Sequence, residues 1–352
     1  MSSRVIRPVA MAPRIAARAR MRLPRAVVLT VIIAVVLLML GAAWDLSIGA
    51  QAMSPKDALA ALFGPADTLQ HQIMLTLRLP RVVLALIVGA ALAVAGVVMQ
   101  GSVANPLAAP DIVGVSAGAA LVTVIGVTFF AGMSGTSLVM LSIAGSAVAA
   151  GVVLAVANAG QGRSSPVRVA LAGVTVTAML LSLTQALLLL HQNGTAGVFL
   201  WLVGGVNDAS WADIVTAAPW LLAGTVLSLA LAVRLNIIAL GDDTASGIGV
   251  NVTRTRLLAV LAVVLLAGAS VAVAGPVAFV GLIVPHIVRR LVGYNHLVVI
   301  PVSILLGAAT LVLADVGSRY VQFPFETPTG IITALIGAPF FIYLARKVRK
   351  RP

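Results

Sequence analysis

The chain has 352 residues, of which 61% are apolar and only 9% are charged, and its formal net charge is +13. An ordinary soluble domain is roughly 45–50% apolar and about 25% charged. So few charges cannot cover a water-facing surface, so the composition excludes a soluble globular protein and predicts an all-α membrane protein. The absence of cysteine excludes disulfides, thiolate metal sites and a cysteine nucleophile.

The first apolar stretch follows a strongly basic segment. Residues 1–25 contain seven arginines and no acid, and the uncharged run 26–44 comes directly after them. This arrangement is typical of a membrane helix whose N-terminal end faces the cytoplasm. A cleavable signal peptide is the alternative, because small residues occur at Ala50-Gln51-Ala52, but the apolar run is longer than a usual signal sequence allows.

Further uncharged stretches predict nine more spans, each long enough to cross a bilayer as a helix. The run 257–288 counts twice, because it is too long for one crossing and is broken by Gly275-Pro276. The prediction is a single ten-helix permease domain over residues 26–345, between basic tails at 1–25 and 346–352. The nine spans come from the stretches 82–100, 112–131, 137–157, 169–190, 214–233, 257–288, 297–314 and 330–344.

The positive charges are unevenly divided between the two sides of this arrangement. With both ends of the chain on the cytoplasmic side, 19 of the 23 lysines and arginines fall on that side. The positive-inside rule predicts such an excess over short loops. The net charge is therefore explained by orientation, and no nucleic-acid partner is expected. The four cations on the outer side are Lys56, Arg78, Arg81 and Arg319.

No energy source for transport is visible in the chain. Its three lysines follow Pro55, Arg346 and Arg349, so the Gly-Lys-Ser/Thr end of a phosphate-binding loop is absent. Ionisable residues inside the spans, which proton-coupled transporters use, are nearly absent, and for Asp315 and His286 a helix-end or interfacial role is the simpler interpretation. The four histidines lack metal-ligand spacing. We therefore expect this chain to have no enzymatic activity and no cofactor. A separate partner protein is expected to supply the energy for transport.

Three segments remain as candidate functional sites. The outer arginines Arg78, Arg81 and Arg319 either snorkel to the interface or form a docking surface for an acidic partner. The stretch 100–114, rich in proline and small polar residues, is either a short loop or a broken helix lining a cavity, and its candidate path residues are Gln100, Asn105 and Pro106. The loop 240–254 is long for a helix connection, which favours short helices on a partner surface over a plain solvated link.

Several motifs together resemble one transporter family. The chain from about residue 70 to its end resembles the iron-siderophore, haem and cobalamin permeases of ABC importers. Each motif alone is weak, but their order along the chain is specific. The motifs are Arg78-Leu79-Pro80-Arg81, Met99-Gln100, Asn105-Pro106-Leu107-Ala108, Gly114-Val115-Ser116-Ala117-Gly118, Leu171-Ala172-Gly173, Trp201 with Gly204-Gly205, the loop 241–249, Gly275-Pro276 with Phe279-Val280-Gly281-Leu282-Ile283-Val284-Pro285-His286-Ile287-Val288-Arg289, Ala314-Asp315 with Arg319, and Gly330 with Gly337-Ala338-Pro339-Phe340.

The resemblance implies a multi-pass subunit of the bacterial inner membrane that pairs with a second permease. Two cytoplasmic ATPase subunits, which bind ATP and Mg, would power it, and a binding protein would deliver the ligand from outside. Arg78, Arg81 and Arg319 would then meet acidic residues of the binding protein. The expected ATPase coupling loop comprises Gly241, Asp242, Asp243, Thr244, Ala245, Gly247 and Gly249.

The expected cargo is a ferric siderophore. The segments 165–168 and 241–245 are most similar to the ferric-siderophore branch, particularly permeases for catecholate chelates, with haem second and cobalamin third. The segment 292–297 departs from the family, because many relatives have Asp-His-Arg after the glycine. The competing class is an ion-gradient-driven secondary transporter with its site at the breaks near Pro106 and Pro276. A membrane-embedded enzyme would lack any nucleophile-base pair.

Overall fold

The computed structural model describes residues 13–49, 53–63, 68–130, 132–133, 135–159, 166–191, 196–321 and 326–349. These residues form helices and connecting turns, and no strand occurs among them. The N-terminal tail is described only from residue 13, and the C-terminal tail only to residue 349. The helices are α1 (Pro13–Ser47), α2 (Pro55–Leu62), α3 (Leu69–Ile73), the π-helical turn η1 (Met74–Arg78), α4 (Leu79–Val103), α5 (Val115–Phe129), α6 (Thr136–Asn158), α7 (Pro166–Leu190), α8 (Ala196–Val203), α9 (Trp211–Ile238), α10 (Asp242–Gly247), α11 (Val252–Ala274), α12 (Val280–Val292), α13 (His296–Val321) and α14 (Thr329–Arg349).

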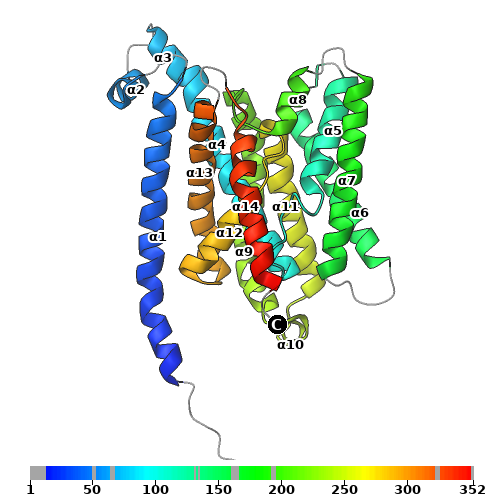
Figure 1. Ribbon diagram of the computed structural model, residues 1–352. Coiled ribbons are helices and arrows are strands. Elements are labelled where there is room, and N and C mark those ends of the chain that lie inside the picture. Colours follow the sequence, from blue (N-terminus) through cyan, green and yellow to red (C-terminus); the bar gives the residue numbers. More distant parts are fainter. Residues whose placement is uncertain are drawn as a thin grey trace, which may run out of the picture.

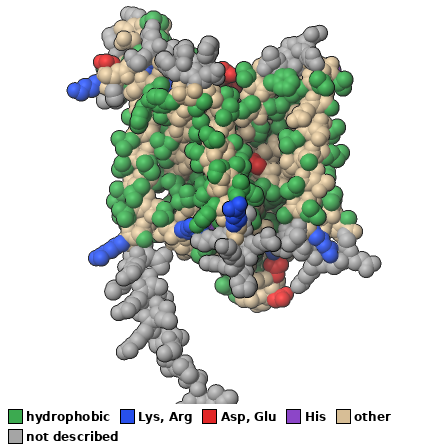
Figure 2. Space-filling view, viewed as in Figure 1, with side chains coloured by type: hydrophobic (Ala, Val, Ile, Leu, Met, Phe, Trp, Pro, Cys, Tyr) green, Lys and Arg blue, Asp and Glu red, His purple; other side chains and the backbone are tan. Residues whose placement is uncertain are grey.

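The long helices stand side by side in one bundle (Figure 1). The short helix α10 projects from one end, which we call the α10 end, and α2 and α3 cap the opposite end, the α2 end. Helix α1 begins and α14 ends at the α10 end. Figure 2 shows apolar side chains over the flank between the two ends, with lysines and arginines gathered mostly at the α10 end. The outer flank is thus suited to contact with lipid.

Every stretch predicted to span the membrane contains a helix. Among the described residues, seven helical segments are long and apolar enough to cross a membrane, namely parts or all of α1, α3 to α4 with η1, α6, α7, α9, α11 and α13. Two shorter apolar helices, α5 and residues 329–344 of α14, cover two further predicted spans. The run 257–288 forms two helices, α11 and α12, as its break predicts. Gly275 adopts φ +63° after α11, and Pro276, which has no backbone N–H, follows it.

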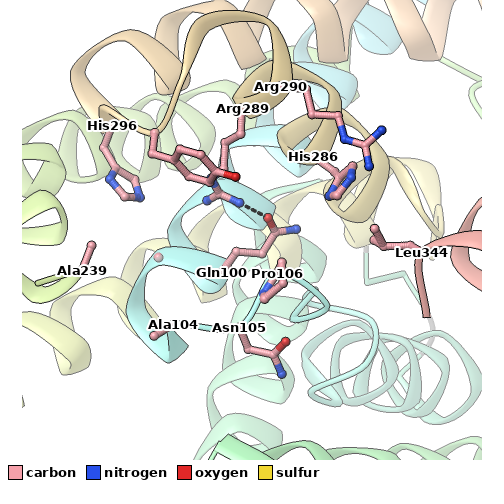
Figure 3. Close-up of a pocket in the computed structure, with 12 residues that line it drawn as sticks. Gln100, Ala104, Asn105, Pro106, Ala239, His286, Arg289, Arg290, His296 and Leu344 are labelled. Carbon is pink, nitrogen blue, oxygen red and sulfur yellow. Dashed lines mark hydrogen bonds between the residues drawn. The ribbon is translucent and has the colours of Figure 1, made fainter. Parts of the chain in front are cut away.

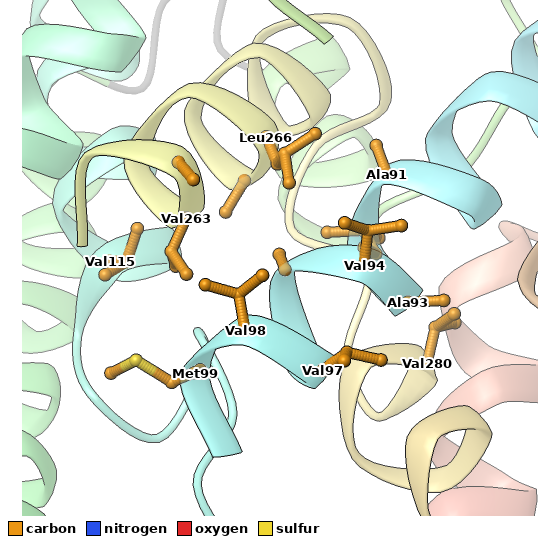
Figure 4. Packing of buried hydrophobic residues seen from close by; sticks show 14 of the residues in the cluster. Ala91, Ala93, Val94, Val97, Val98, Met99, Val115, Val263, Leu266 and Val280 are labelled. Atoms are coloured by element: carbon orange, nitrogen blue, oxygen red, sulfur yellow. The ribbon is translucent and has the colours of Figure 1, made fainter. Parts of the chain in front are cut away.

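Helix α4 lies at the centre of the bundle. Its apolar span is 78% buried within this single chain, compared with 17% for that of α1. In Figure 4, Val94, Val97 and Val98 of α4 pack near side chains of α11 and α12, such as Leu266 and Val280. A helix with apolar side chains all round is expected at such a buried position.

Glycines let α4 approach its neighbours closely. A Cβ atom added at Gly96 would lie 1.8 Å from the carbonyl oxygen of Gly281 in α12. A Cβ at Gly89 would lie 2.4 Å from the carbonyl oxygen of Gly307 in α13. Because lipid provides little hydrophobic drive between helices, such backbone contacts are a main source of packing energy in a membrane bundle.

Between α4 and α5, the helical structure is interrupted inside the protein. Helix α4 ends at Ala104, which adopts the left-handed conformation at φ 53°, and α5 starts after Gly114 at φ 83°. The intervening segment consists of turns, and Ala108, Ala109 and Pro110 within it are buried. Irregular backbone of this kind is tolerated in a membrane protein where the surrounding protein covers it or where it lines a cavity.

Candidate functional site

A cavity of about 710 Å³ opens at the α2 end. Its lining includes all three arginines that the sequence singles out, Arg78, Arg81 and Arg319, although each side chain is largely buried. Arg78 comes from η1, Arg81 from the first turn of α4 and Arg319 from the last turn of α13. Two acidic residues, Asp208 and Glu326, also line this cavity. The fold therefore brings the predicted docking residues together around one opening.

A buried ion cluster lies beneath this opening. The carboxylate of Asp315 accepts hydrogen bonds from Nε and Nη2 of Arg81 at 2.7 and 3.1 Å, and from Nη2 of Arg319 at 3.2 Å. Thr329 donates a fourth hydrogen bond at 2.6 Å. Arg319 also forms an ion pair with Asp45 of α1 at 2.6 Å. The cluster ties together α1, α4, α13 and α14, since each carries at least one of its members.

One member of this cluster was missed in the sequence interpretation, and another was given a lesser role. Asp45, fully buried, was not singled out, and Asp315 was interpreted as a helix-end polar group rather than as the centre of an ionic network. Glu326 was also missed, and its carboxylate accepts a hydrogen bond from Nη1 of Arg81 at 2.7 Å. The available signal was charge matching. Isolated acids at the ends of nearly uncharged spans faced isolated arginines on the same side of the predicted topology.

A second cavity, of about 510 Å³, opens at the α10 end. The three candidate path residues, Gln100, Asn105 and Pro106, all line it. Gln100 accepts a hydrogen bond from Arg289 of α12 through Oε1 and donates one to the carbonyl of Gly281 at 3.3 Å (Figure 3). From the sequence, Arg289 was placed at the end of a family motif and among the cytoplasmic charges, but this contact with Gln100 was not predicted.

The broken segment that follows Pro106 is held by a buried carboxylate. Asp111 accepts hydrogen bonds from the Ser116 hydroxyl at 2.7 Å and from the backbone N–H of Phe279 at 3.3 Å. Phe279 adopts φ +68°, an unusual conformation for a residue with a side chain. Asp111 thus joins the break after α4 to the break after α11.

The predicted coupling loop forms the short helix α10 and its flanking turns. Gly241 and Gly249, at φ +108° and +89°, take the left-handed conformations that start and end it. Ala245 is buried on the inward side, whereas Asp243, Thr244 and Gly247 are exposed. The prediction of a short helix in this loop is confirmed by α10.

Helix α10 is fixed to the bundle by one arginine. Arg256 of α11 donates two hydrogen bonds to the Asp242 carboxylate, both at 2.9 Å. The same guanidinium donates through Nε to the carbonyl of Ser102 in α4 at 3.0 Å. A bidentate arginine pair of this kind has a defined geometry as well as favourable energy. Arg256 therefore links α10 to the end of α4 beside the α10-end cavity.

Helix α4 connects the two cavities. Arg81 lies in its first turn and Gln100 near its last, and 19 residues at 1.5 Å per residue separate them by about 29 Å. In the described part of the chain, no group of three or more His, Cys, Asp or Glu residues is placed to hold a metal ion. The geometry is that of two openings at opposite ends of a membrane-sized bundle, with a projecting helix at one of them.

Residues 33–347 match the FecCD transport family. The chain belongs to this family. Among FecCD relatives, it is 44% identical to the Fe(3+)-citrate import system permease protein YfmD of Bacillus subtilis, over 90% of this chain and 94% of that protein. It is 39% identical to the Fe(3+) dicitrate transport system permease protein FecC of Escherichia coli, over 84% of this chain and 90% of that protein.

The FecCD fold is also seen among solved structures. The chain is similar to a metal-chelate type ABC transporter in an inward-facing conformation, with 30% identity and a TM-score of 0.77. The match covers 90% of this chain and 98% of the other. The sequence-based expectation of an iron-chelate permease of an ABC importer is confirmed by the FecCD match and these relatives.

Proposed function

We propose that this chain is the membrane-spanning permease subunit of an ATP-driven importer that carries a ferric chelate into the bacterial cytoplasm. The observation that carries the proposal is the 44% identity to an Fe(3+)-citrate import permease over 90% of the chain. The arrangement of two cavities joined by one central helix supports the same function, since a transporter needs access from both sides of the membrane. No chemical step is assigned to the chain itself.

The α10 end is assigned to the cytoplasm. The arginines of α9, α11 and α12, including Arg234, Arg254 and Arg290, lie toward this end, and the positive-inside rule places such residues in the cytoplasm. On this assignment, α5, α12 and α14 complete ten crossings of the inner membrane. The permease domain is then residues 26–345, with basic tails at 1–25 and 346–352 in the cytoplasm.

The partners follow from this orientation. A second permease, either the same chain or a close relative, would complete the translocation path. Two ATPase subunits carrying ATP and Mg would contact α10 from the cytoplasm. The exposure of Asp243, Thr244 and Gly247 supports α10 as this contact, and the link from Asp242 through Arg256 to α4 gives ATPase movement a route to the α10-end cavity.

The proposed binding-protein dock is the cavity at the α2 end. Three arginines line it, and carboxylates pair readily with guanidinium groups. Arg81 and Arg319 already form ion pairs with Asp315. They would therefore contribute to docking through the electrostatic potential at the opening as well as through direct contacts. Arg78 donates a hydrogen bond to the carbonyl of Leu46 at 2.6 Å and belongs to the same lining.

The cargo class is a ferric chelate rather than a single named compound. Relatives for citrate, hydroxamate and enterobactin are 44%, 41% and 37% identical to this chain. These values are close, so the ranking supports the ferric-chelate class without singling out the catecholates that the sequence segments favour. Haem and cobalamin are the alternative cargoes within the same family.

Reconstitution tests the function. We expect proteoliposomes containing the permease, the ATPase and the binding protein to accumulate a ferric chelate only when ATP is present on the side of the membrane that carries the ATPase. Uptake that continues without ATP but stops when an ion gradient is dissipated would favour the secondary transporter over the ATP-driven importer. The permease alone should give no accumulation.

A steric test addresses docking. Thr76 is exposed at the rim of the α2-end cavity, so Thr76→Trp should fill the opening without touching the ion cluster. We expect the affinity for the binding protein to fall roughly tenfold, which corresponds to a loss of about 1.4 kcal/mol of binding free energy. Surface plasmon resonance on the reconstituted permease measures this. Leu69→Trp, which is also exposed at the α2 end but lies outside the cavity lining, is the matched control. Equal affinities for both variants would remove this cavity from the docking surface.

A further inference from the structure

The two cavities differ in how their positive charge is balanced. At the α2 end, three arginines share the lining with two acidic residues, Asp208 and Glu326. At the α10 end, Arg289, Arg290, His286 and His296 line the cavity, and none of its twelve lining residues is acidic. The α10-end cavity therefore carries positive charge that its own walls do not neutralise.

Arg289 has only neutral hydrogen-bond acceptors around it. It donates to Oε1 of Gln100 and to the carbonyl of Val97 at 3.2 Å. Arg81, Arg256 and Arg319 form ion pairs, whereas no acidic side chain among the described residues pairs with Arg289. Arg289 is half-buried, so an anion that enters the cavity gains a favourable electrostatic attraction to it.

His296 offers a further polar group at the cavity wall. Only 4% of the residue is exposed, and Nδ1 lies 2.7 Å from Oδ1 of Asn236. Since that oxygen can only accept, Nδ1 carries the proton and donates. Among the described residues, no hydrogen-bond partner is found for Nε2 of His296, which is buried. Because Nε2 is buried, His296 shapes the cavity wall, and the ligand contacts are assigned to the arginines and Asn105.

We propose that the α10-end cavity is a binding site for the anionic, carboxylate-bearing part of an iron chelate, occupied just before release to the cytoplasm. The proposal rests on the function proposed above. Arg289 and Arg290 would attract the carboxylates, and Asn105 would bind a further oxygen. The cavity volume of about 510 Å³ is within the usual range for small-molecule sites.

The membrane potential gives such a site a purpose. An anionic chelate that moves toward the negative interior of a bacterium moves against the electrical potential, and the opposing energy grows with its charge. Fixed positive charge at the inner end of the path offsets this opposition. A neutral chelate does not meet this barrier, so the site should discriminate between cargoes by their charge.

The proposal places this cavity on the translocation path because its lining includes the candidate path residues at the end of α4. Asn105 and Pro106 follow the end of α4, and Gln100 is 3% exposed on its last turns (Figure 3). An anionic lipid headgroup presents similar oxygens and can be drawn to basic pockets at the cytoplasmic side of membrane proteins. The cavity wall reaches inward to the buried Gln100, which favours the chelate, and the experiment separates the two ligands.

Binding of radiolabelled ferric citrate to the permease–ATPase complex in phosphatidylcholine nanodiscs tests the site. Arg290 is exposed, so Arg290→Gln should fold normally, and we expect roughly tenfold weaker binding of ferric citrate. Asn105→Asp, which adds a negative charge to the wall, should weaken it as well. Arg234→Gln removes one exposed charge at the same end outside the lining and should keep the wild-type affinity. Binding of a neutral ferric trihydroxamate should be unchanged in all variants.

The outcomes separate the site from the function. Equal affinity for ferric citrate in wild type, Arg290→Gln and Asn105→Asp would overturn the site. The wild-type complex could instead bind no ferric citrate but retain added phosphatidylglycerol, with this lipid lost from Arg290→Gln. That result would assign the cavity to lipid and would also overturn the chelate site. ATP-driven uptake of ferric citrate is measured separately in proteoliposomes. If uptake is present while binding is insensitive to these substitutions, the site fails and the proposed function stands.

Discussion

Replacing Asp315 by asparagine should strongly destabilise the folded permease. The carboxylate neutralises Arg81 and Arg319, both buried, and accepts four hydrogen bonds. Removing one partner of a buried ion pair typically costs 3–5 kcal/mol, so we expect about that loss for Asp315→Asn. The change in stability is measured by heating the detergent-purified protein and using size-exclusion chromatography to monitor the loss of folded protein with temperature.

Glu326→Gln provides a matched control for this prediction. Glu326 binds the same arginine, Arg81, at 2.7 Å, but its side chain is 49% exposed. An exposed ion pair contributes only about 0.2–1 kcal/mol, so Glu326→Gln should have a small effect. If both variants unfolded at the same temperature, the cluster around Asp315 would not be a principal tie between α1, α4 and α13.

Replacing Gly247 by tryptophan should abolish coupling between ATP hydrolysis and uptake. No atom lies within 4 Å of a Cβ added at Gly247, so the bundle itself accommodates a side chain there. The indole would instead occupy the exposed side of α10, where the ATPase is proposed to bind. We expect ATP-driven uptake to fall by at least about tenfold, corresponding to some 1.4 kcal/mol, with no change in thermal stability. Proteoliposome uptake and ATPase activity are measured on the same sample.

Gly151→Trp controls for the addition of a large side chain. Gly151 lies in α6, and a Cβ there also meets nothing within 4 Å. It is far in sequence from α10 and faces outward from the bundle, so uptake should stay at the wild-type level. Full uptake by Gly247→Trp would exclude this face of α10 from the ATPase contact.

The ion cluster shows why side-chain pairing could not be derived from the sequence. Asp45, Arg81 and Asp315 are separated by many residues, and their contacts depend on how α1, α4 and α13 pack. Charge matching could have suggested partners, but several pairings satisfy it equally. Burial decides between a surface dock and an internal network, and burial depends on neighbours that are distant in sequence.

The all-helical membrane class, the stretches that form helices and the break at Gly275-Pro276 were all predictable from the amino-acid sequence. These features follow from local properties, namely apolar runs of sufficient length, absent charge and a proline that cannot continue a hydrogen-bond ladder. The folded chain was needed to show that Gln100, Asn105 and Pro106 share one cavity with Arg289. It also shows that the lining of this cavity contains arginines and no acid, whereas the lining of the α2-end cavity contains both. Packing brings distant segments together, and the electrostatic character of a cavity depends on which of these segments form its walls.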